Sequence, residues 1–403
     1  MSRLADRLLR LREAVPTEKG VRGQSAPSGA IGSLKRPSRR MTRNRIGPDT
    51  PPPGADWRQT AEFVWERCLD YPAILPGILD SGFILPPHTK SAELVVYDLE
   101  TIGLSGGAGN TAFLIGLGNQ TGRFYRLTQL FLADYPGEAA MLSRYGRLTE
   151  NHALHVSYNG LSFDSQVLRT RFLLNRLPPP SSSQSDLLYP ARRLWRGRLP
   201  SLSMKSVEAG VLGFFRNDDL PGSEAPEAWF SWLDGHPDRI DGVFRHNADD
   251  VLSLARLLAR LEEWGEAVPS DSRTWPAGTT PSSRGMARQW ERNNSDREIQ
   301  WLQAGWFGGN TDCGHELAFR MKRRGDYSQA VEIWKEINAS PAGDYRSAIE
   351  LAKYWEHRRH NPGNALASIE RLDEPLATIR QEEELAHRRK RLWRKLSGGH
   401  NRP

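Results

Sequence analysis

The sequence LVVYDLETIGLSGGAG, residues 94–109, decides how the rest of the chain is interpreted. It begins with four residues of apolar, strand-forming character, so a strand is predicted over Leu94–Tyr97. Asp98 and Glu100 follow one residue apart, and side chains at positions i and i+2 of a strand point to the same side of the sheet. Two carboxylates held this close repel each other unless a cation lies between them. This stretch is therefore the first candidate for a functional site.

Beyond this stretch the pattern changes to further strands and then to strands alternating with helices. Three strands in succession, followed by strand and helix in turn, predict an α/β fold with a mixed sheet instead of a purely parallel one. The predicted strands are Leu94–Tyr97, Ala112–Gly118, Arg123–Leu132 and His155–Tyr158. The predicted helices are Glu138–Asn151, Phe163–Leu177 and Val243–Trp264. The last helix is the strongest prediction, because its valine and leucines recur at helical spacing along one side.

Changes of composition along the chain predict four segments. Residues 1–55 are basic and rich in Gly, Pro and Ser, and beyond a short amphipathic helix expected near the start they are predicted to be disordered. Residues 56–265 are predicted to form the α/β domain. Residues 266–285, rich in Pro, Ser and Thr, are predicted to be a linker, and residues 286–396 a helical region.

The net charge of +7 is concentrated at the N-terminus. Residues 1–46 contain 12 Lys and Arg against 3 Asp and Glu, a local net charge of +9, which leaves about −2 for the remaining residues. A basic tail of this kind indicates a polyanionic partner, most simply nucleic acid. A solvated tail without a partner explains the same composition, and the sequence does not separate the two explanations.

Composition also limits the class of protein. A chain of 403 residues is long enough for two domains with substantial cores, and its 38% hydrophobic content is typical of soluble proteins. No apolar run approaches the length of a membrane span, and the first residues lack the apolar region of a signal peptide. The cysteines, Cys68 and Cys313, lie far apart, which argues against a disulfide framework or a zinc site. We therefore expect a cytoplasmic protein that makes no contact with a membrane.

The C-terminal region contains a repeated pattern. The dipeptide Leu-Ala recurs at residues 317–318, 351–352 and 385–386, with a spacing of 34 residues both times. A helix-pair period of 34 residues is the signature of tetratricopeptide repeats. We expect tetratricopeptide-like repeats here, and a protein partner that binds to them. Ordinary helix packing with a chance recurrence of two small residues is the alternative.

Two further segments supply acidic residues at the edges of predicted elements. NGLSFD (residues 159–164) places Asp164 after the fourth strand, at the start of a helix. HNADD (residues 246–250) places His246 and Asp250 four residues apart, on one face of the long helix. Carboxylates from three elements can form an oxygen-rich cage for two ions of Mg²⁺ or Mn²⁺. The candidate ligands are Asp98, Glu100, Asp164 and Asp250.

Such a cage suits the hydrolysis of phosphodiester bonds. Two cations about 3.5–4 Å apart stabilise both the attacking and the leaving oxygen of an in-line displacement. A histidine beside them, here His246, can accept a proton from the attacking water. Each motif alone has an ordinary explanation, because Asp-x-Glu is often a solvated turn and either His246 or Asp249 can cap a helix. The specific signal is their joint occurrence in this order.

At these residues the chain resembles the DEDD exonuclease superfamily of the ribonuclease H-like fold. Within it, the chain is similar to the YprB-type bacterial proteins, which carry C-terminal tetratricopeptide repeats. The segments that carry the resemblance are YDLETIGLSGGAGNTAFLIGLG (97–118), VSYNGLSFD (156–164) and HNADDVLSL (246–254). Further matching segments are DLLYPARRLW (186–195), SVEAGVLG (206–213) and RNDDLPGSEAP (216–226). The resemblance covers about residues 90–262 and, more loosely, the repeats.

The resemblance implies a mixed central sheet flanked by helices and a metal-dependent 3′–5′ exonuclease. Such an enzyme hydrolyses DNA or RNA, here expected to be single-stranded 3′ ends, by a two-metal mechanism. The implied ligands of two Mg²⁺ or Mn²⁺ ions are Asp98, Glu100, Asp164 and Asp250, with His246 as a further catalytic residue. The implied substrate-binding residues are Thr101, Gly103, Leu104 and Asn159.

His246 departs from the better-known subfamilies, in which His lies five residues, or Tyr four residues, before the last aspartate. At a spacing of four, His246 can act as the base, or it can lie off line and leave the cations to generate hydroxide. Asp249 competes with Asp250 for the role of last ligand. Asp250 is preferred because it shares the helix face of His246.

Two alternative functions belong to other classes: a nuclease-like module that binds nucleic acid without cutting it, and a scaffold whose repeats hold a protein. Four mutually repelling carboxylates argue against a pure binding module. The basic run RRLWRGR, residues 192–198, also has two explanations. It can line a channel for the nucleic-acid backbone with Trp195 as a stacking platform, or it is a solvated helix face with a buried Trp195.

Overall fold

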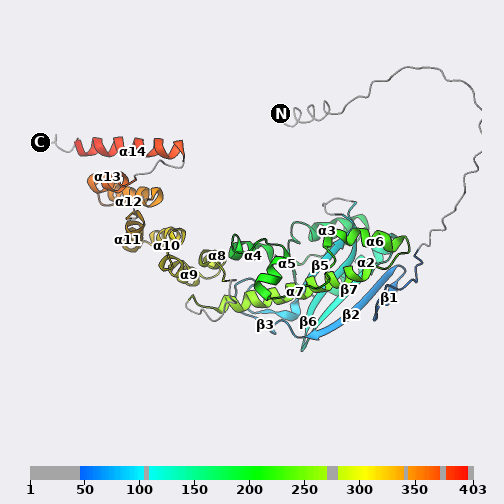
Figure 1. The fold of residues 1–403 in the computed structure, drawn as a ribbon. Coiled ribbons are helices and arrows are strands. Elements are labelled where there is room, and N and C mark those ends of the chain that lie inside the picture. The colour runs from blue at the N-terminus through cyan, green and yellow to red at the C-terminus, as the bar shows by residue number, and fades with distance from the viewer. Residues whose placement is uncertain (1–45, 104–108, 270–279, 340–343, 373–377, 398–403) are drawn as a thin grey trace, which may run out of the picture. The chain divides into compact units, whose positions relative to one another are not determined.

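The computed structural model describes residues 46–103, 109–269, 280–339, 344–372 and 378–397 (Figure 1), and all of them fall within one unit of the chain, residues 43–403. Within these described residues, seven strands form a mixed sheet. In spatial order the strands are β1 (Arg58–Ala61), β2 (Val64–Pro72), β7 (Phe124–Leu132), β6 (Ala112–Thr121), β5 (Leu94–Thr101), β8 (Leu154–Ser157) and β9 (Ser183–Asp186). A second, two-stranded sheet pairs β3 (Ile78–Leu79) with β4 (Thr89–Lys90).

Strand β5 lies inside the large sheet and carries the opening sequence motif. It pairs antiparallel with β6 and parallel with β8, which confirms the prediction of a mixed sheet. Because helices cover both faces of β5, its apolar residues form a continuous run instead of alternating with polar ones. The strand continues beyond the predicted Leu94–Tyr97 to Thr101, so that Asp98 and Glu100 are part of it.

The sequence did not predict three strands of this sheet. Strand β2 pairs antiparallel with β7 along its whole length, and β1 continues the sheet beyond β2. The pattern of β2, VWERCLDYP, mixes charged and apolar residues because its second half is only partly buried. Strand β9, SQSD, contains no strand-forming residue and is held by parallel pairing with β8.

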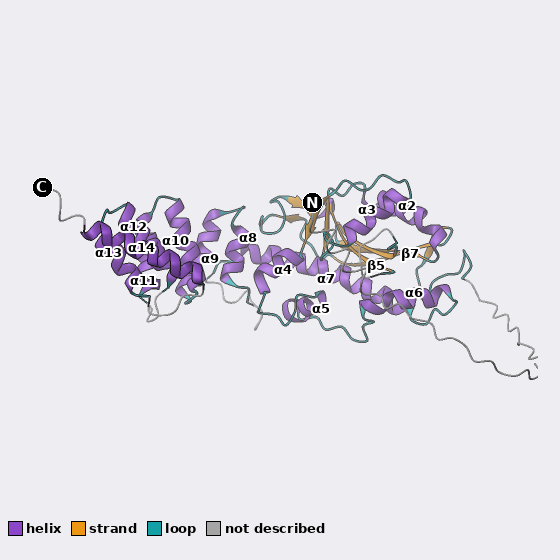
Figure 2. Ribbon diagram, turned by 90° about the horizontal axis from the view of Figure 1, so that it is seen from above, coloured by secondary structure: helices purple, strands orange, loops and turns teal. Residues whose placement is uncertain are grey.

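Helices cover the two faces of the sheet. In the part of the chain that ends at residue 269, the described α-helices are α2 (Glu138–Thr149), α3 (Asp164–Leu174), α4 (Leu188–Trp195), α5 (Met204–Val207), α6 (Ala225–Leu233) and α7 (Ile240–Glu266). Figure 2 shows the sheet nearly edge-on between α2 and α3 on one side and α7 on the other. On β5, Leu94 and Val96 belong to the core on the α7 side, whereas Val95 and Tyr97 belong to the opposite core.

Helix α7 places its functional residues over the sheet. Its apolar side chains recur at helical spacing and are fully buried against β5, β6 and β7, which confirms the strongest helix prediction. A close approach to β6 is possible because Gly116 has no side chain. A Cβ atom on Gly116 would lie 2.4 Å from Asn247 Oδ1 and 2.8 Å from Val251 Cγ2.

The C-terminal part of the described chain is entirely helical, as expected. The helices are α8 (Ser283–Trp290), α9 (Ser295–Phe307), α10 (Thr311–Arg323), α11 (Tyr327–Asn338), α12 (Tyr345–His357), α13 (Pro362–Glu370) and α14 (Ile379–Ser397). Consecutive helices pack against each other. Helices α10, α12 and α14 begin 34 residues apart, and each buries the leucine of its Leu-Ala dipeptide. The assignment as tetratricopeptide repeats stays a prediction.

The helical region shares its core with the sheet domain. Helix α8 begins at Ser283, inside the predicted linker, and packs against α4. Gln289 Nε2 donates to Phe83 O at 2.6 Å, and one continuous apolar cluster extends from Leu94 of β5 to Ile337 of α11. The predicted domain boundaries stay predictions.

Two other expectations concern Trp195 and the N-terminal segment. Trp195 is fully buried beside Trp264, with ring centroids 5.5 Å apart, so it is a core anchor and not a stacking platform. The helix expected in residues 1–15, and the basic tail up to residue 45, lie outside the described residues. Among the helices that the structure describes, none combines the length and the apolar character needed to cross a bilayer.

Candidate metal centre

The candidate ligands come from three elements. Asp98 and Glu100 lie at the end of β5 and face α7, because the even-numbered residues of this strand are on the α7 side of the sheet. Asp164 is the first residue of α3. His246 and Asp250 lie one turn apart on α7. The structure therefore brings together chain segments that are far apart in the sequence.

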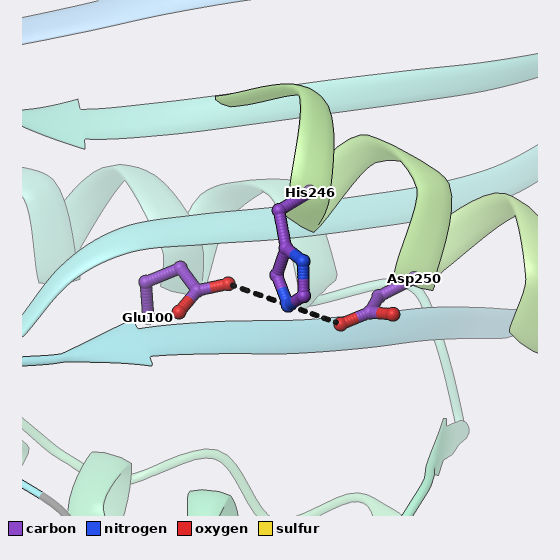
Figure 3. A group of neighbouring side chains, drawn as sticks. All are labelled: Glu100, His246 and Asp250. Carbon is purple, nitrogen blue, oxygen red and sulfur yellow. Dashed lines mark ion pairs between the residues drawn. The ribbon is translucent and has the colours of Figure 1, made fainter. Parts of the chain in front are cut away.

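Three of these residues form the tightest group. Ligand atoms of Glu100, His246 and Asp250 all lie within 4.8 Å of one another, and this is the group among the described residues that meets the requirements for holding an ion. Figure 3 shows the His246 ring between the two carboxylates. Its Nε2 lies 3.4 Å from Asp250 Oδ2 and 4.0 Å from Glu100 Oε1.

Asp98 is held by a buried hydrogen-bond chain that begins on α7. Asn247 Nδ2 donates to Asp98 Oδ2 at 2.9 Å. Gln129 Nε2 donates to Asn247 Oδ1 at 2.8 Å, and Arg67 Nε donates to Gln129 Oε1 at 2.7 Å. Asn247 and Gln129 are fully buried, so both amides have one fixed orientation. The chain leaves the other oxygen of Asp98 for a ligand.

Asp164 is positioned by the loop in front of α3. Asn159 adopts a left-handed backbone conformation with φ of +64°, and a Cβ atom on Gly160 would lie 2.3 Å from Ser157 Oγ. Asp186, at the end of β9, accepts hydrogen bonds from the backbone N–H groups of Asn159 at 2.8 Å and Leu161 at 3.2 Å. Asp186 therefore fixes the loop that presents Asp164.

Burial and mutual repulsion make the carboxylates hard to ionise without a counter-charge. Burial, and next the charge of Asp250, raise the pKa of both Asp98 and Glu100 well above the usual range. Burial, followed by the charges of Asp186 and Asp250, raises the pKa of Asp164 to about 7. Asp164 in turn contributes to the raised pKa of Asp98, so it belongs to the same electrostatic cluster. The cluster favours a bound cation.

One buried arginine enters the cluster from a loop. Arg216, whose side chain is 2% exposed, makes a bidentate pair with Glu208 at 2.8 and 2.5 Å. Its Nη2 also donates to Asp250 Oδ1. Arg216 is too buried to reach a substrate, so we assign it the task of orienting Asp250, whose second oxygen then faces Glu100 and His246.

His246 is oriented by Asp219. Its Nδ1 lies 2.7 Å from Asp219 Oδ1 and 3.2 Å from Arg216 Nη1. Arginine only donates, so a bond from Arg216 needs Nδ1 without a proton, whereas a bond to the Asp219 carboxylate needs Nδ1 with a proton. Nδ1 therefore makes only one of the two hydrogen bonds. The shorter contact, to a carboxylate, is best explained by an Nδ1–H that donates to Asp219. This tautomer leaves the Nε2 lone pair facing the carboxylates.

Of the predicted substrate-binding residues, Thr101 ends β5 and Gly103 follows it in the chain. Thr101 is buried, and its Oγ1 donates to Gly103 O at 2.8 Å. Asn110 Nδ2 donates to the same carbonyl at 3.0 Å. Asn159 is exposed at the tip of its loop. Leu104 lies outside the described residues. The four substrate-binding roles stay predictions.

Sequence reasoning missed the residues that orient the ligands: Asn247, Gln129, Asp186, Glu208, Arg216 and Asp219. One signal was present for Asn247. It lies four residues from both Val243 and Val251, so it is an amide on the buried stripe of α7 and needs a partner. Asp249, the rival of Asp250, is not part of the tightest group.

Comparison with known proteins identifies the family. Residues 95–262 match the RNase_H superfamily. Over 329 residues the chain is 32% identical to YprB, an uncharacterized protein of Bacillus subtilis (strain 168), and the match covers 77% of this chain and 78% of that protein. The chain belongs to the YprB family. In this YprB-family chain the superfamily match begins in β5 and ends in α7, which confirms a ribonuclease H-like fold followed by a helical region.

Two solved structures are also similar. The family B DNA polymerase of the archaeon Pyrobaculum calidifontis is 14% identical with a TM-score of 0.35, covering 57% of this chain and 34% of that one. The zinc-bound E. coli ExoI–ssDNA complex is 19% identical with a TM-score of 0.26, covering 38% and 43%. The YprB-family chain thus spans less than half of either protein. At these TM-scores neither likeness supports a statement about function.

Proposed function

We propose that this chain is a metal-dependent 3′–5′ exonuclease that hydrolyses phosphodiester bonds of nucleic acid by a two-metal mechanism. The observation that carries the proposal is the group of Glu100, His246 and Asp250, whose ligand atoms lie within 4.8 Å of one another, with Asp98 and Asp164 coupled to it by charge repulsion. The ribonuclease H-like fold supports nuclease activity in general.

The residues present fit divalent cations. Carboxylate oxygens are the donors that Mg²⁺ and Mn²⁺ prefer, and burial together with mutual repulsion raises the pKa values of Asp98 and Glu100, which a bound cation would offset. We propose that Asp98, Glu100, Asp164 and Asp250 hold two such ions. Bound there, the ions would polarise the scissile phosphate and lower the pKa of water.

The chain's own residues supply the positioning. Asn247 fixes one oxygen of Asp98, and Arg216 fixes one oxygen of Asp250, so that each carboxylate offers its second oxygen. Asp186 holds the loop that carries Asp164. Such preorganisation matters because a displacement of about 1 Å can cost a factor of about 100 in rate.

We propose that the end of the nucleic-acid strand binds beside β5, with Thr101, Gly103, Leu104 and Asn159 as its contacts. The position of Thr101 and Gly103 directly after Glu100 supports this role. The expected substrate is a single-stranded 3′ end of DNA or RNA, as the resemblance to DEDD exonucleases implies.

The test is a nuclease assay on single- and double-stranded DNA and RNA, labelled at either end, with Mg²⁺, Mn²⁺ or a chelator. Stepwise shortening of 5′-labelled strands, with release of single nucleotides from 3′-labelled ones, is the expected result. Asp98→Asn and Asp250→Asn should reduce the rate at least about 100-fold, the typical effect of removing one preorganised electrostatic group.

Asp249→Asn is the matched control, because it removes the same charge one residue away from Asp250 and outside the tightest group. It should keep most of the activity and the stability of the wild type. Wild-type rates in folded Asp98→Asn and Asp250→Asn variants would contradict the proposal. Binding of labelled strands without any cleavage would favour the binding-module alternative.

We further propose that the helical region consists of tetratricopeptide-like repeats that bind a partner protein. We also propose that the present chain works in the cytoplasm. The 34-residue offset between α10, α12 and α14 supports the repeats. Each of these helices buries the same leucine position: Leu317, Leu351 and Leu385. Capture of one defined protein by the full chain, lost when exposed side chains of α10 and α12 are substituted, would test this role.

A further inference from the structure

The His246 ring lies close enough to two carboxylates for its Nε2 to share a cation with them. Its Nε2 lies 3.4 Å from Asp250 Oδ2 and 4.0 Å from Glu100 Oε1, and the three atoms face one another (Figure 3). Two ligands of one ion, each at roughly 2.1–2.2 Å, lie at most about 4.4 Å apart. Both separations from Nε2 fall within this limit.

The ring is prepared to bind a cation. Asp219 accepts the hydrogen bond from Nδ1 at 2.7 Å, which leaves a lone pair on Nε2. A carboxylate on the far nitrogen is the usual second partner of a histidine that binds a metal, because it fixes the tautomer and raises the basicity of the ring. The side chain of Asp219 is 9% exposed and forms an ion pair with Lys205, with Nζ 3.7 Å from Oδ2.

Glu100 gives independent support. Its side chain is 9% exposed, and its carboxylate meets His246 Nε2 only across the long separation of 4.0 Å. A buried carboxylate this far from its ion-pair partner is costly unless a cation binds it. The space beside Nε2 is also kept open by Gly222, because a Cβ atom there would lie 3.2 Å from Nε2.

We propose that His246 is a ligand of one of the cations, through Nε2 and together with Glu100 and Asp250, and that Asp219 positions it. This inference rests on the proposed function only for the expectation that divalent cations bind here. An imidazole nitrogen is a poorer ligand for Mg²⁺ than for transition metals. The structure therefore assigns to this cation position a preference for Mn²⁺ over Mg²⁺.

The alternative role, a general base, asks for a different geometry. A base must face the proton that it removes, at about 2.6–3.2 Å from the donor atom. Here Nε2 points between two carboxylates that are themselves candidate ligands. A water molecule placed there would compete with the cation for the same space.

The experiment measures nitrogen coordination directly. The full chain, freed of any histidine tag, is loaded with Mn²⁺ alone and examined by pulsed EPR for hyperfine coupling between the ion and ¹⁴N. The wild type should show this coupling, and His246→Ala and His246→Gln should lose it. His236→Ala, which removes an exposed histidine from the loop before α7, is the matched control and should keep it.

Calorimetric titration with Mn²⁺ and Mg²⁺ completes the test. Loss of the nitrogen ligand should weaken Mn²⁺ binding at least tenfold and Mg²⁺ binding less, so that the preference for Mn²⁺ disappears. Asp219→Asn should retain the nitrogen coupling but weaken Mn²⁺ binding about 10–100-fold, the usual effect of removing a metal ligand's outer partner.

Bound Mn²⁺ without ¹⁴N coupling in the wild type overturns the inference, and this measurement depends on no variant being folded. Equal Mn²⁺ affinity of wild type and folded His246→Gln overturns it as well. A wild type that cleaves nucleic acid but lacks nitrogen coupling retains the proposed function and loses only this inference. A wild type that shows the nitrogen coupling but has no nuclease activity retains this inference and loses the proposed function.

Discussion

Gly116→Ala tests whether the contact between α7 and β6 sets the geometry of the candidate metal centre. Gly116 lies opposite Asp98 in the neighbouring strand, and α7 packs directly over it. The added Cβ would lie 2.4 Å from Asn247 Oδ1 and 2.8 Å from Val251 Cγ2. Both neighbours are fully buried, so neither side chain has free space into which it could move.

The structure sets the size of the effect. Ordinary contact of a Cβ atom begins at 3.4 Å, so the shortest contact falls short by about 1 Å and α7 must retreat by a similar distance. Overpacking of this kind costs about 1–3 kcal/mol of folding free energy. The same displacement moves His246 and Asp250 away from β5, and a shift of about 1 Å can reduce a rate about 100-fold.

Urea unfolding followed by circular dichroism measures the loss of stability, and Mn²⁺ titration together with the nuclease assay measures the loss at the site. Gly77→Ala is the matched control, because a Cβ on Gly77 meets no atom within 4 Å. The reasoning is refuted if Gly116→Ala has the urea midpoint and Mn²⁺ affinity of the wild type.

Three further predictions concern other parts of the chain. Asp186→Ala removes the acceptor of three backbone N–H groups, so the free energy of unfolding should fall by about 2–4 kcal/mol and Mn²⁺ binding should weaken; an unchanged urea midpoint would contradict this. Burial alone would raise the pKa of Glu356, but hydrogen bonds and charges from Arg391 and Lys395 lower it from 4.5 to about 2. Its contribution, about 3 kcal/mol, is present above pH 4.5 and is lost as the pH falls toward 2. Stability should therefore drop between about pH 5 and about pH 2, and the drop should be smaller in Glu356→Gln. After chelation, Mn²⁺ at a hundred times its dissociation constant should stabilise the wild type by about 2.7 kcal/mol in thermal melts but not Asp250→Asn; equal shifts would rule out cation binding by this carboxylate.

The centre of the fold could be predicted because its physical cause is local. Strands β5, β6 and β7 are buried and rich in strand-forming residues, and α7 repeats its apolar residues at helical spacing. Strand β9 could not be predicted, because its four polar residues have no preference for a strand and are held by parallel pairing with β8. The charges of β2 hid its pairing with β7 in the same way.

At the candidate site, the carboxylates could be predicted and the groups that orient them could not. Acidic residues at the edge of one element are common, but their joint occurrence at three elements in this order stands out in the sequence. Arg216 lies in a loop 34 residues before Asp250, and nothing in its local sequence indicates that it is buried against Asp250 and Glu208. Such partners are determined by tertiary packing, which leaves no periodic pattern in the chain.

The apolar cluster that joins the sheet to the helical region affects how the molecule can be dissected. Met286 and Trp290 of α8 are buried in the same cluster as Leu94 of β5. Dividing the chain near residue 285 would therefore expose apolar surface to solvent on both fragments. Truncated versions are therefore expected to aggregate instead of behaving as autonomous modules. For the same reason, fusing the helical region to an unrelated enzyme would require a new apolar contact surface on that enzyme as well as a linker.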